Sequence, residues 1–454
     1  MTMPLIHLID GLRLGGMARI MQSLAILADR DRFLPILAGI EADSSFVCHL
    51  REQGLVAGAI GVELAGLGEF VKPGSSFIVV IHRSGESEPL WDRVVPLLIE
   101  KGAALVVNQN AFSHVDSGPT ADLVDMCMFY SRDAMRQHWK RAGRPAVESY
   151  LKKHRVLHCA VTKEPALEDV AEARREMRHR LGIPQDAFVI GDTCRPDARK
   201  LDPIALLALP RIIHEIPNCW FIARRYPSLA ESLVRGKARK RVINLPVSQD
   251  DGDMFRTYAA MDVFVHGSTM GESFGMSIAE AMRCGLPVVA NETPKNNCDN
   301  AQGELVLHGE TGYLVNDSLS LLQALQSLAA SPALARRMGI AARCRFNDAP
   351  YSPSSIISQF EAELESCARD KGIALGEGSQ VLERDPSDAV MGRFLLEHKR
   401  TYSVPRPDAP WPVRPWVEYV QGGRLAWRGL RKIVEGQGRV YRRLQGLRRQ
   451  FPSH

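Results

Sequence analysis

The 454-residue chain lacks several features that would assign it to a specialised class of protein. It has no run of about 18 uninterrupted apolar residues, so a membrane-spanning helix is not expected. Its first residues, MTMPLIHLIDGLRLGG, have neither the charged region nor the small-residue cleavage site of a secretory signal. The nine cysteines include no C-x-x-C pair, which argues against a disulfide framework or a zinc site and fits a reducing compartment. We therefore expect a cytoplasmic globular protein.

The net charge of +5 is unevenly distributed along the chain. Residues 421–454 carry nine Lys or Arg and one acid, so this segment is about +8 and the remainder about −3. Several apolar residues of the segment fall near one helical face, a pattern that suits an anionic membrane surface. Packing against the chain's own acidic surface or another subunit is an equal alternative. Nucleic acid is not an expected partner, because only the tail is basic and no recognition module is visible.

Short apolar runs alternate with longer helical patterns from the start of the chain to about Leu328. Several runs are apolar on both faces, which is typical of parallel strands covered by helices on each side. The sequence therefore predicts an α/β fold of two facing, doubly wound, Rossmann-like sheets with a cleft between them. The predicted strands are PLIHLID, FIVVI, ALVVN, VDMCMFY, FVIGDT, CWFIA, RVINL, DVFVHG and PVVAN.

The predicted boundaries divide the chain into four parts. The strand–helix alternation restarts near Phe188 after a charged helical stretch, so we place the first domain at 1–165 and the second at 166–345. A helix is predicted after Ser352, as its N-cap, with Pro353 in the first turn; it occupies the part 346–371 and packs back toward the N-terminal domain. Residues 372–454 form an extension with a Pro- and Trp-rich arm and the basic tail.

Two predicted loops between a strand and a helix carry residues that suit an anion. Gly15 and Gly16 precede the first helix, where the absence of a Cβ lets backbone N–H groups approach a phosphate. Arg195 and Lys200 follow the strand FVIGDT, where two long cationic side chains can converge on one anion. An ordinary turn and a solvated loop are the respective alternatives when each loop is taken alone. No G-x-G-x-x-G dinucleotide fingerprint is present.

A third loop of this kind contains two glutamates, in the stretch GESFGMSIAEAMRCGLPVVA. A helix that begins near Phe274 and Gly275 directs unpaired N–H groups and its positive dipole end toward the cleft. Glu272 precedes this helix and Glu280 lies about one and a half turns inside it. Carboxylates accept hydrogen bonds from neighbouring hydroxyls, so two of them beside an anion site suit a nucleotide sugar.

Taken together, these elements resemble the GT-B glycosyltransferases, most closely the family-4 retaining enzymes (glycosyltransferase group 1). The E-x7-E element from Glu272 to Glu280 is the most specific feature. Arg195 and Lys200, Gly15 and Gly16, the run 287–290 and the sequence ELVLHGETGYLVND match further family features. The resemblance covers roughly residues 4–370 and is most specific between 262 and 316.

The resemblance implies a role for each candidate residue. Glu280 would hold the ribose hydroxyls and Glu272 the hydroxyls of the transferred sugar. The backbone of Phe274, Gly275 and Met276, together with Arg195 and Lys200, would bind the diphosphate, and His82 would lie near the donor sugar. Leu245 and Val247 would pack the base. No D-x-D motif or metal site is predicted, and no cofactor is expected besides the nucleotide-sugar substrate. Asn110 departs from the family, many of whose members carry a histidine in that loop.

The expected activity is metal-independent transfer of a hexose-type sugar from a nucleotide sugar to a saccharide or lipid-linked acceptor, with retention. It would serve surface polysaccharide or glycolipid synthesis at the inner face of the cell membrane. Two alternatives remain open at this stage. One is a nucleotide-sugar epimerase on the same fold, and the other is a catalytically weak nucleotide-binding or assembly subunit.

Overall fold

The computed structural model describes most of the chain up to residue 397. The described residues are 2–83, 88–111, 113, 115, 120–162, 167–193, 203–224, 234, 236–246, 248, 250–268, 271–292, 299–315, 318–375 and 387–397. Arg195, Lys200 and Val247, the Pro- and Trp-rich arm and the basic segment 421–454 lie outside this set.

The N-terminal half contains a seven-stranded sheet in the order β3-β2-β1-β4-β5-β6-β7. Every neighbouring pair is parallel. Its strands are β1 Met3–Leu12, β2 Phe33–Ala42, β3 Val56–Ala59, β4 Phe77–Arg83, β5 Ala103–Asn110, β6 Met126–Phe129 and β7 His154–Val156. Its helices are α1 Gly16–Leu27, α2 Ser44–Glu52, α3 Glu88–Glu100, α4 Arg132–Arg141 and α5 Val147–Lys153, with 3₁₀ turns η1 Ala65–Glu69 and η2 Ala121–Leu123.

The C-terminal half contains a six-stranded parallel sheet in the order β10-β9-β8-β11-β13-β15. Its strands are β8 Phe188–Asp192, β9 Cys219–Arg224, β10 Val242–Leu245, β11 Val263–His266, β13 Val288–Asn291 and β15 Gly312–Val315, and a separate pair joins β12 Gly271–Glu272 to β14 Asp299–Asn300. Its helices are α6 Leu167–Arg180, α7 Pro203–Glu215, α9 Asp251–Ala259, α10 Met276–Arg283, α11 Gln302–Leu305, α12 Ser318–Ala330 and α13 Pro332–Arg345, with η3 Gly236–Arg241.

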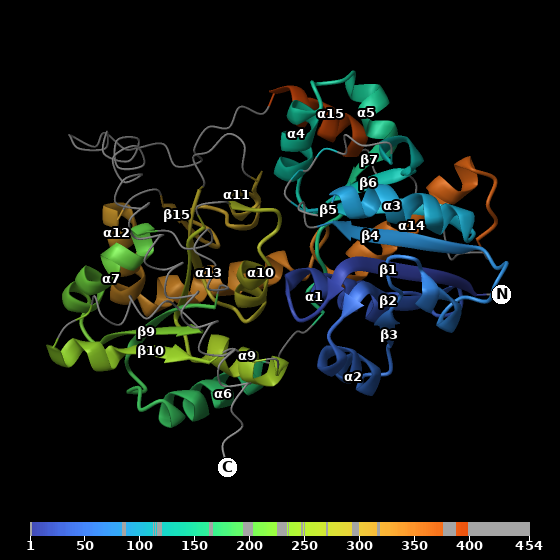
Figure 1. The fold of residues 1–454 in the computed structure, drawn as a ribbon. Helices are drawn as coiled ribbons and strands as arrows, with labels where there is room; N and C mark the ends of the chain where they lie inside the picture. The colour runs from blue at the N-terminus through green and yellow to red at the C-terminus, as the bar shows by residue number, and fades with distance from the viewer. Residues whose placement is uncertain are drawn as a thin grey trace, which may run out of the picture.

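The two sheets lie side by side, and helices from each half meet between them (Figure 1). Strand β4 is buried along its whole length, as expected for a central parallel strand covered on both faces. Each half has an apolar cluster of its own, and a further cluster joins residues of both halves, so the halves share part of their core. The predicted pair of parallel, doubly wound sheets is thus confirmed.

The helix predicted after Ser352 is α14 Pro353–Asp370, and its N-cap is the one expected. The Ser352 hydroxyl accepts a hydrogen bond from the Ser355 backbone N–H at 3.3 Å. The helix packs on the N-terminal half, where the Phe360 ring stacks on His7 with 5.9 Å between ring centroids. The Arg155 side chain of β7 donates to Glu363 at 2.9 Å. The chain therefore returns to its first sheet after completing the second.

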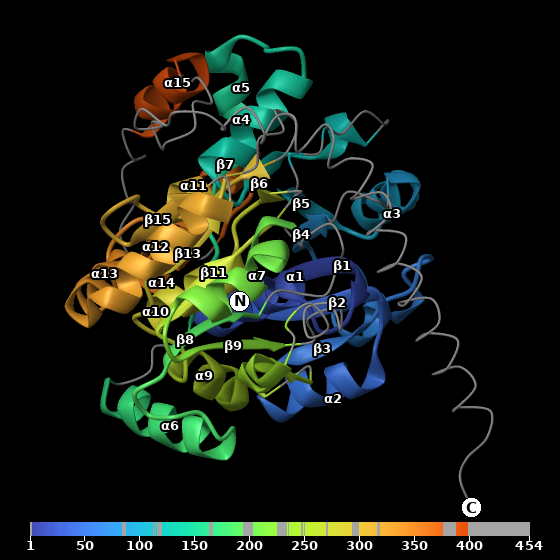
Figure 2. The same cartoon turned by 90° about the vertical axis from the view of Figure 1, so that its left-hand side faces the viewer.

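The final described helix, α15 Ser387–Glu397, lies beside α4 and α5 (Figure 2). Within its described part, 390–396, Met391 and Leu395 are buried. The Arg132 guanidinium of α4 lies 5.6 Å from the centroid of the Phe394 ring, within the range of a cation–π contact. Among the described residues, no helix combines the length and the apolar character needed to cross a membrane.

A buried guanidinium ties the start of the second sheet together. Arg178 of α6 is 0% exposed and donates to Asp262 at 2.8 Å. Asp262 precedes β11 and also accepts the Val189 N–H of β8 at 2.7 Å. Burying the Arg178 charge is tolerable because the guanidinium is paired with Asp262, which is 23% exposed, and is hydrogen-bonded. This contact fixes β8 beside β11, the two strands whose far ends lead to the candidate site.

Candidate active site

The E-x7-E stretch folds as a short strand, a tight turn and a helix. Glu272 ends β12, Gly275 is the N-cap of α10, and the helix begins at Met276. Gly275 has φ = 102°, in the left-handed region that favours glycine. A Cβ there would also lie 3.1 Å from Cδ1 of Ile278. The predicted start of the helix near Phe274 and Gly275 is confirmed, and Gly275 is needed for the turn.

Glu280 stands on α10 with one carboxylate oxygen hydrogen-bonded. The Tyr258 hydroxyl of α9 donates to its Oε2 at 2.7 Å. Thr193, just after β8, lies 2.8 Å from the same hydroxyl; because Tyr258 donates to Glu280, Thr193 is the donor in this second bond. Burial raises the pKa of Glu280, and the cation of Arg19 opposes that rise. The network places Glu280 beyond the carboxyl end of a parallel strand, where ligands of such sheets bind.

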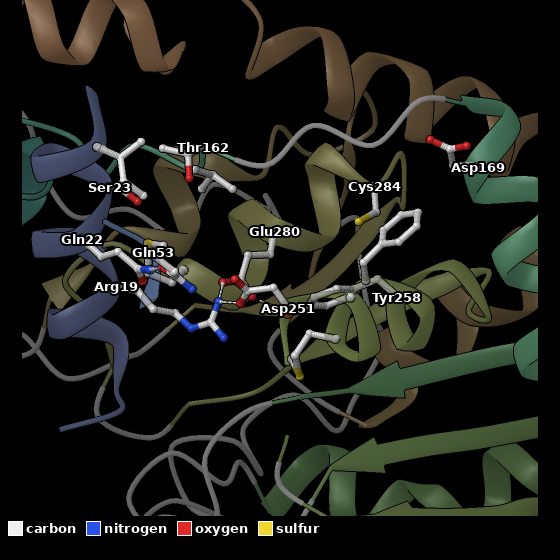
Figure 3. A pocket seen from close by; sticks show the side chains of 16 residues that line it. Arg19, Gln22, Ser23, Gln53, Thr162, Asp169, Asp251, Tyr258, Glu280 and Cys284 are labelled. Atoms are coloured by element: carbon white, nitrogen blue, oxygen red, sulfur yellow. Dashed lines mark hydrogen bonds and ion pairs between the residues drawn. The ribbon is translucent and has the colours of Figure 1, made fainter. Parts of the chain in front are cut away.

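Glu280 faces a cavity of about 710 Å³ between the two halves of the chain (Figure 3). Arg19, Gln22 and Ser23 of α1 form one wall, and residues of α9 and α10 form the other. Arg19 reaches across: its Nη1 lies 2.6 Å from Asp251 Oδ1 and 3.9 Å from Glu280 Oε1. A cavity of this size between two sheets is the usual place for a small-molecule ligand.

Glu272 lies on the second sheet's side and does not line this cavity. Its side chain is 8% exposed, and its carboxylate is 3.3 Å from Nε2 of His266, the last residue of β11. The Gln302 side chain accepts from its backbone N–H at 3.2 Å. Both acids of the motif are therefore held at the carboxyl ends of the second sheet, but only Glu280 opens onto the cavity.

The remaining predicted donor-binding residues fall in several environments. Met276 lines the cavity, whereas the Phe274 side chain is 3% exposed and packs in the shared core. Gly15 is the N-cap of α1 with φ = 175°, an extended conformation open to any residue. A Cβ on Gly16 would meet no atom within 4 Å. Leu245 ends β10 and packs partly buried against the shared core.

His82 lies near the end of β4, in the interior of the protein. It is 0% exposed, and its Nε2 is 3.1 Å from Nδ1 of His7, also fully buried. Burial, with a smaller contribution from His7, lowers the pKa of His82, so the ring is neutral at pH 7. Asn110 ends the neighbouring strand β5 and is also 0% exposed.

The cationic pair Arg195 and Lys200, and Val247, lie outside the described residues. Among the residues that the structure describes, no group of three or more His, Cys, Asp or Glu has the arrangement of a metal site. The polar groups of the described part of the site are carboxylates, a guanidinium, side-chain amides and hydroxyls, beside the N-terminus of α10.

The sequence did not single out several residues that the structure brings to Glu280. Tyr258 and Asp251 are seven residues apart and lie on one face of α9. In the sequence alone, this spacing indicates only a helix face that packs on a neighbour. In the sequence, Arg19 is one of many helix residues, and its role becomes visible only when the structure places α1 opposite α10. Its contacts join residues more than 230 positions apart in the sequence, so no local signal identifies it.

The chain is similar to known proteins over part of its length. Residues 191–331 match the family model described as Glycosyl transferases group 1. The chain is 33% identical over 189 residues to D-inositol 3-phosphate glycosyltransferase of Streptomyces avermitilis, covering 38% of this chain and 39% of that protein. It is 29% identical over 154 residues to spore coat protein SA of Bacillus subtilis, covering 32% and 39%. The matches thus span about two fifths of the length of these curated relatives.

The fold is shared with a solved structure over a larger part of the chain. Anabaena Alr3699/HepE in complex with UDP and glucose superposes with a TM-score of 0.61 at 18% identity, covering 80% of this chain and 100% of the other. The same protein has also been solved with UDP-glucose. This chain has the GT-B fold, and its residues 191–331 match the family model of the group 1 glycosyltransferases.

Proposed function

We propose that the protein transfers a sugar from a nucleoside diphosphate sugar to a saccharide or lipid-linked acceptor. UDP-sugars are the first donors to test, because the structural relative binds UDP and UDP-glucose. The observation that carries the proposal is Glu280, an E-x7-E carboxylate that faces a cavity between two Rossmann-like halves. A diol-binding acid at this point is what a nucleotide ribose requires.

The proposed roles follow the order of groups in such a donor. Glu280 accepts hydrogen bonds from the ribose hydroxyls, and the cavity between α1, α9 and α10 takes the nucleoside. The diphosphate lies at the N-terminus of α10, where free N–H groups and the helix dipole favour negative charge. We assign Gly16 to the same diphosphate site, where the space beside its Cα is open among the described residues, apart from its neighbours in the chain. Glu272 holds the hydroxyls of the transferred sugar.

The proposed chemistry is departure of the nucleoside diphosphate, helped by positive charge. As the anomeric carbon–oxygen bond breaks, negative charge grows on the departing diphosphate. Arg195 and Lys200, with the α10 N-terminus, stabilise that charge more in the transition state than in the ground state. We propose that the reaction proceeds without a metal and with retention of configuration, and that EDTA leaves the rate unchanged.

The test separates donor binding from sugar transfer with two matched variants. Glu280→Gln is expected to weaken binding of the nucleoside diphosphate itself, because a carboxylate that accepts hydrogen bonds from two hydroxyls becomes a neutral amide. Glu272→Gln is expected to leave that binding nearly unchanged and to slow release of nucleoside diphosphate from the nucleotide sugar. Calorimetry measures the first quantity and a coupled nucleotide-release assay the second. Equal loss of binding in both variants contradicts the two roles.

The basic segment 421–454 enters this proposal through the acceptor. A lipid-linked acceptor requires the enzyme at a membrane, and a segment with nine Lys or Arg and one acid suits an anionic surface. Sedimentation with vesicles that contain phosphatidylglycerol is expected to retain the full chain but not a chain that ends at residue 420. Retention of both, or of neither, contradicts this role.

A further inference from the structure

Arg19 crosses the cleft to the acid to which we assign the ribose. It belongs to α1 of the N-terminal half, whereas Asp251 and Glu280 belong to the C-terminal half. Its Nη1 lies 2.6 Å from Asp251 Oδ1 and 3.9 Å from Glu280 Oε1. The first distance is that of a charge-assisted hydrogen bond, and the second is a charge–charge contact without one. Figure 3 shows the Arg19 side chain extended toward both carboxylates.

The two oxygens of Glu280 therefore differ. Oε2 accepts the Tyr258 hydroxyl at 2.7 Å, while no hydrogen bond to Oε1 comes from any described residue. Asp251 fixes the guanidinium, so Arg19 faces Oε1 without occupying its lone pairs. A ribose hydroxyl that reaches Oε1 would meet a carboxylate whose other oxygen is held by the Tyr258 hydroxyl and whose negative charge is balanced by Arg19.

The environment of Glu280 otherwise disfavours its ionised form. Its side chain is 20% exposed, and burial raises its pKa. Among the described residues, the titratable groups around it are Asp251 and Tyr258 on α9 and Cys284, the C-cap of α10, and Asp169 of α6 lines the same cavity. Asp251 adds a like charge, and burial raises the pKa values of Tyr258 and Cys284, which stay neutral at pH 7. Among these described groups, Arg19 alone contributes positive charge.

We propose that Arg19 is a positioning residue that keeps Glu280 ionised across the cleft, so that Glu280 Oε1 accepts the ribose hydroxyls of the donor nucleotide. This inference rests on the proposed function, and it adds a residue from the opposite half to the nucleotide site. Asp251 acts through Arg19: it holds the guanidinium in place, 3.9 Å from Glu280 Oε1, where the positive charge stabilises the ionised carboxylate. The pKa of Arg19 is lowered by burial but raised on balance by Glu280 and Asp251, so the cation persists.

The test is the pH dependence of UDP binding by Arg19→Gln, measured by calorimetry relative to the wild-type protein at each pH. Loss of a unit charge 3.9 Å away raises the pKa of Glu280, by about one unit or more at a partly exposed site. The ratio of variant to wild-type Kd is therefore expected to be small near about pH 8.5 and to grow about tenfold toward about pH 5.5. Ionisation of UDP itself cancels in the ratio.

Three controls make this result specific. Arg19→Lys keeps the charge and is expected to restore the wild-type profile. In a Glu280→Gln background, the pH dependence of the Arg19→Gln effect is expected to disappear, because no carboxylate remains to titrate. Arg93→Gln removes an equivalent charge from an exposed pair with Glu63, and it is expected to change neither the Kd for UDP nor the pH dependence of that Kd.

The outcomes distinguish this inference from the proposed function. If wild-type protein binds UDP and the Arg19→Gln ratio is the same at every pH, or Arg19→Lys behaves like Arg19→Gln, the positioning role is wrong. If the wild-type protein binds none of UDP, GDP, dTDP, CDP and ADP, the nucleotide site itself is wrong, and with it both proposals.

Discussion

Replacement of Arg178 by Met is the perturbation whose cost the structure defines best. The guanidinium is 0% exposed and donates to Asp262 at 2.8 Å and to the carbonyls of Ala260, Gln185 and Ala187, each at 2.9 Å. Removing the guanidinium leaves the buried carbonyls of Ala260 and Ala187 without this donor, at about 1–3 kcal/mol each, whereas Asp262 is 23% exposed and keeps its pair with Arg174. Asp262 retains its bond from the Val189 N–H, whereas the three carbonyls lose a donor. We expect about 4 kcal/mol of lost stability.

The assay is urea-induced unfolding followed by circular dichroism, with Arg174→Met as the matched control. Arg174 pairs with the same Asp262, but its side chain is 30% exposed, so water replaces it readily. Its loss is expected to cost about 1 kcal/mol, as for other solvent-accessible pairs. If Arg178→Met and Arg174→Met have equal and small effects, burial does not set the cost and the reasoning is refuted.

Two further predictions concern packing and pH. A Cβ on Gly339 of α13 would lie 1.9 Å from the Gly285 carbonyl oxygen, so Gly339→Ala is expected to push α13 from α10 and lower the melting temperature; an unchanged value contradicts this packing. Burial raises the pKa of Glu304 from 4.5 to about 7, so the stability that Glu304 contributes is fully present below pH 4.5 and lost as pH rises through 7. As the pH rises from 4.5 to 7, the unfolding free energy of Glu304→Gln is expected to increase on the order of 3 kcal/mol relative to that of the wild-type protein. A difference in unfolding free energy between the two proteins that stays constant with pH contradicts this prediction.

The sequence predicted the strands near the centre of both sheets well. Runs such as FIVVI and PVVAN are apolar on both faces, and they form β4 and β13, which are buried throughout. Strand β7 was not predicted, because it has only three residues and its sequence, His-Arg-Val, has no apolar alternation. Such a strand exists because β6 and α14 support it from either side.

The candidate site was predictable where one local segment carries it. The helix start at Gly275 and the inward position of Glu280 follow from a single strand–turn–helix unit. The contact of Arg19 with Asp251 and Glu280 was not predictable, because it depends on how two independently folded sheets face each other. The burial of His82 against His7 likewise depends on the pairing of β1 with β4.

The most direct test of the central claim is a thermal-shift panel of UDP, GDP, dTDP and CDP on wild-type protein and Glu280→Gln, with and without EDTA. A nucleotide at a hundred times its dissociation constant stabilises the folded state by about 2.7 kcal/mol, which gives a clear shift in melting temperature. We predict that one nucleotide, with UDP the first candidate, shifts the wild-type protein strongly and the variant weakly, with or without EDTA. No shift by any of the four, or an equal shift in both proteins, would contradict a nucleotide-sugar site at Glu280.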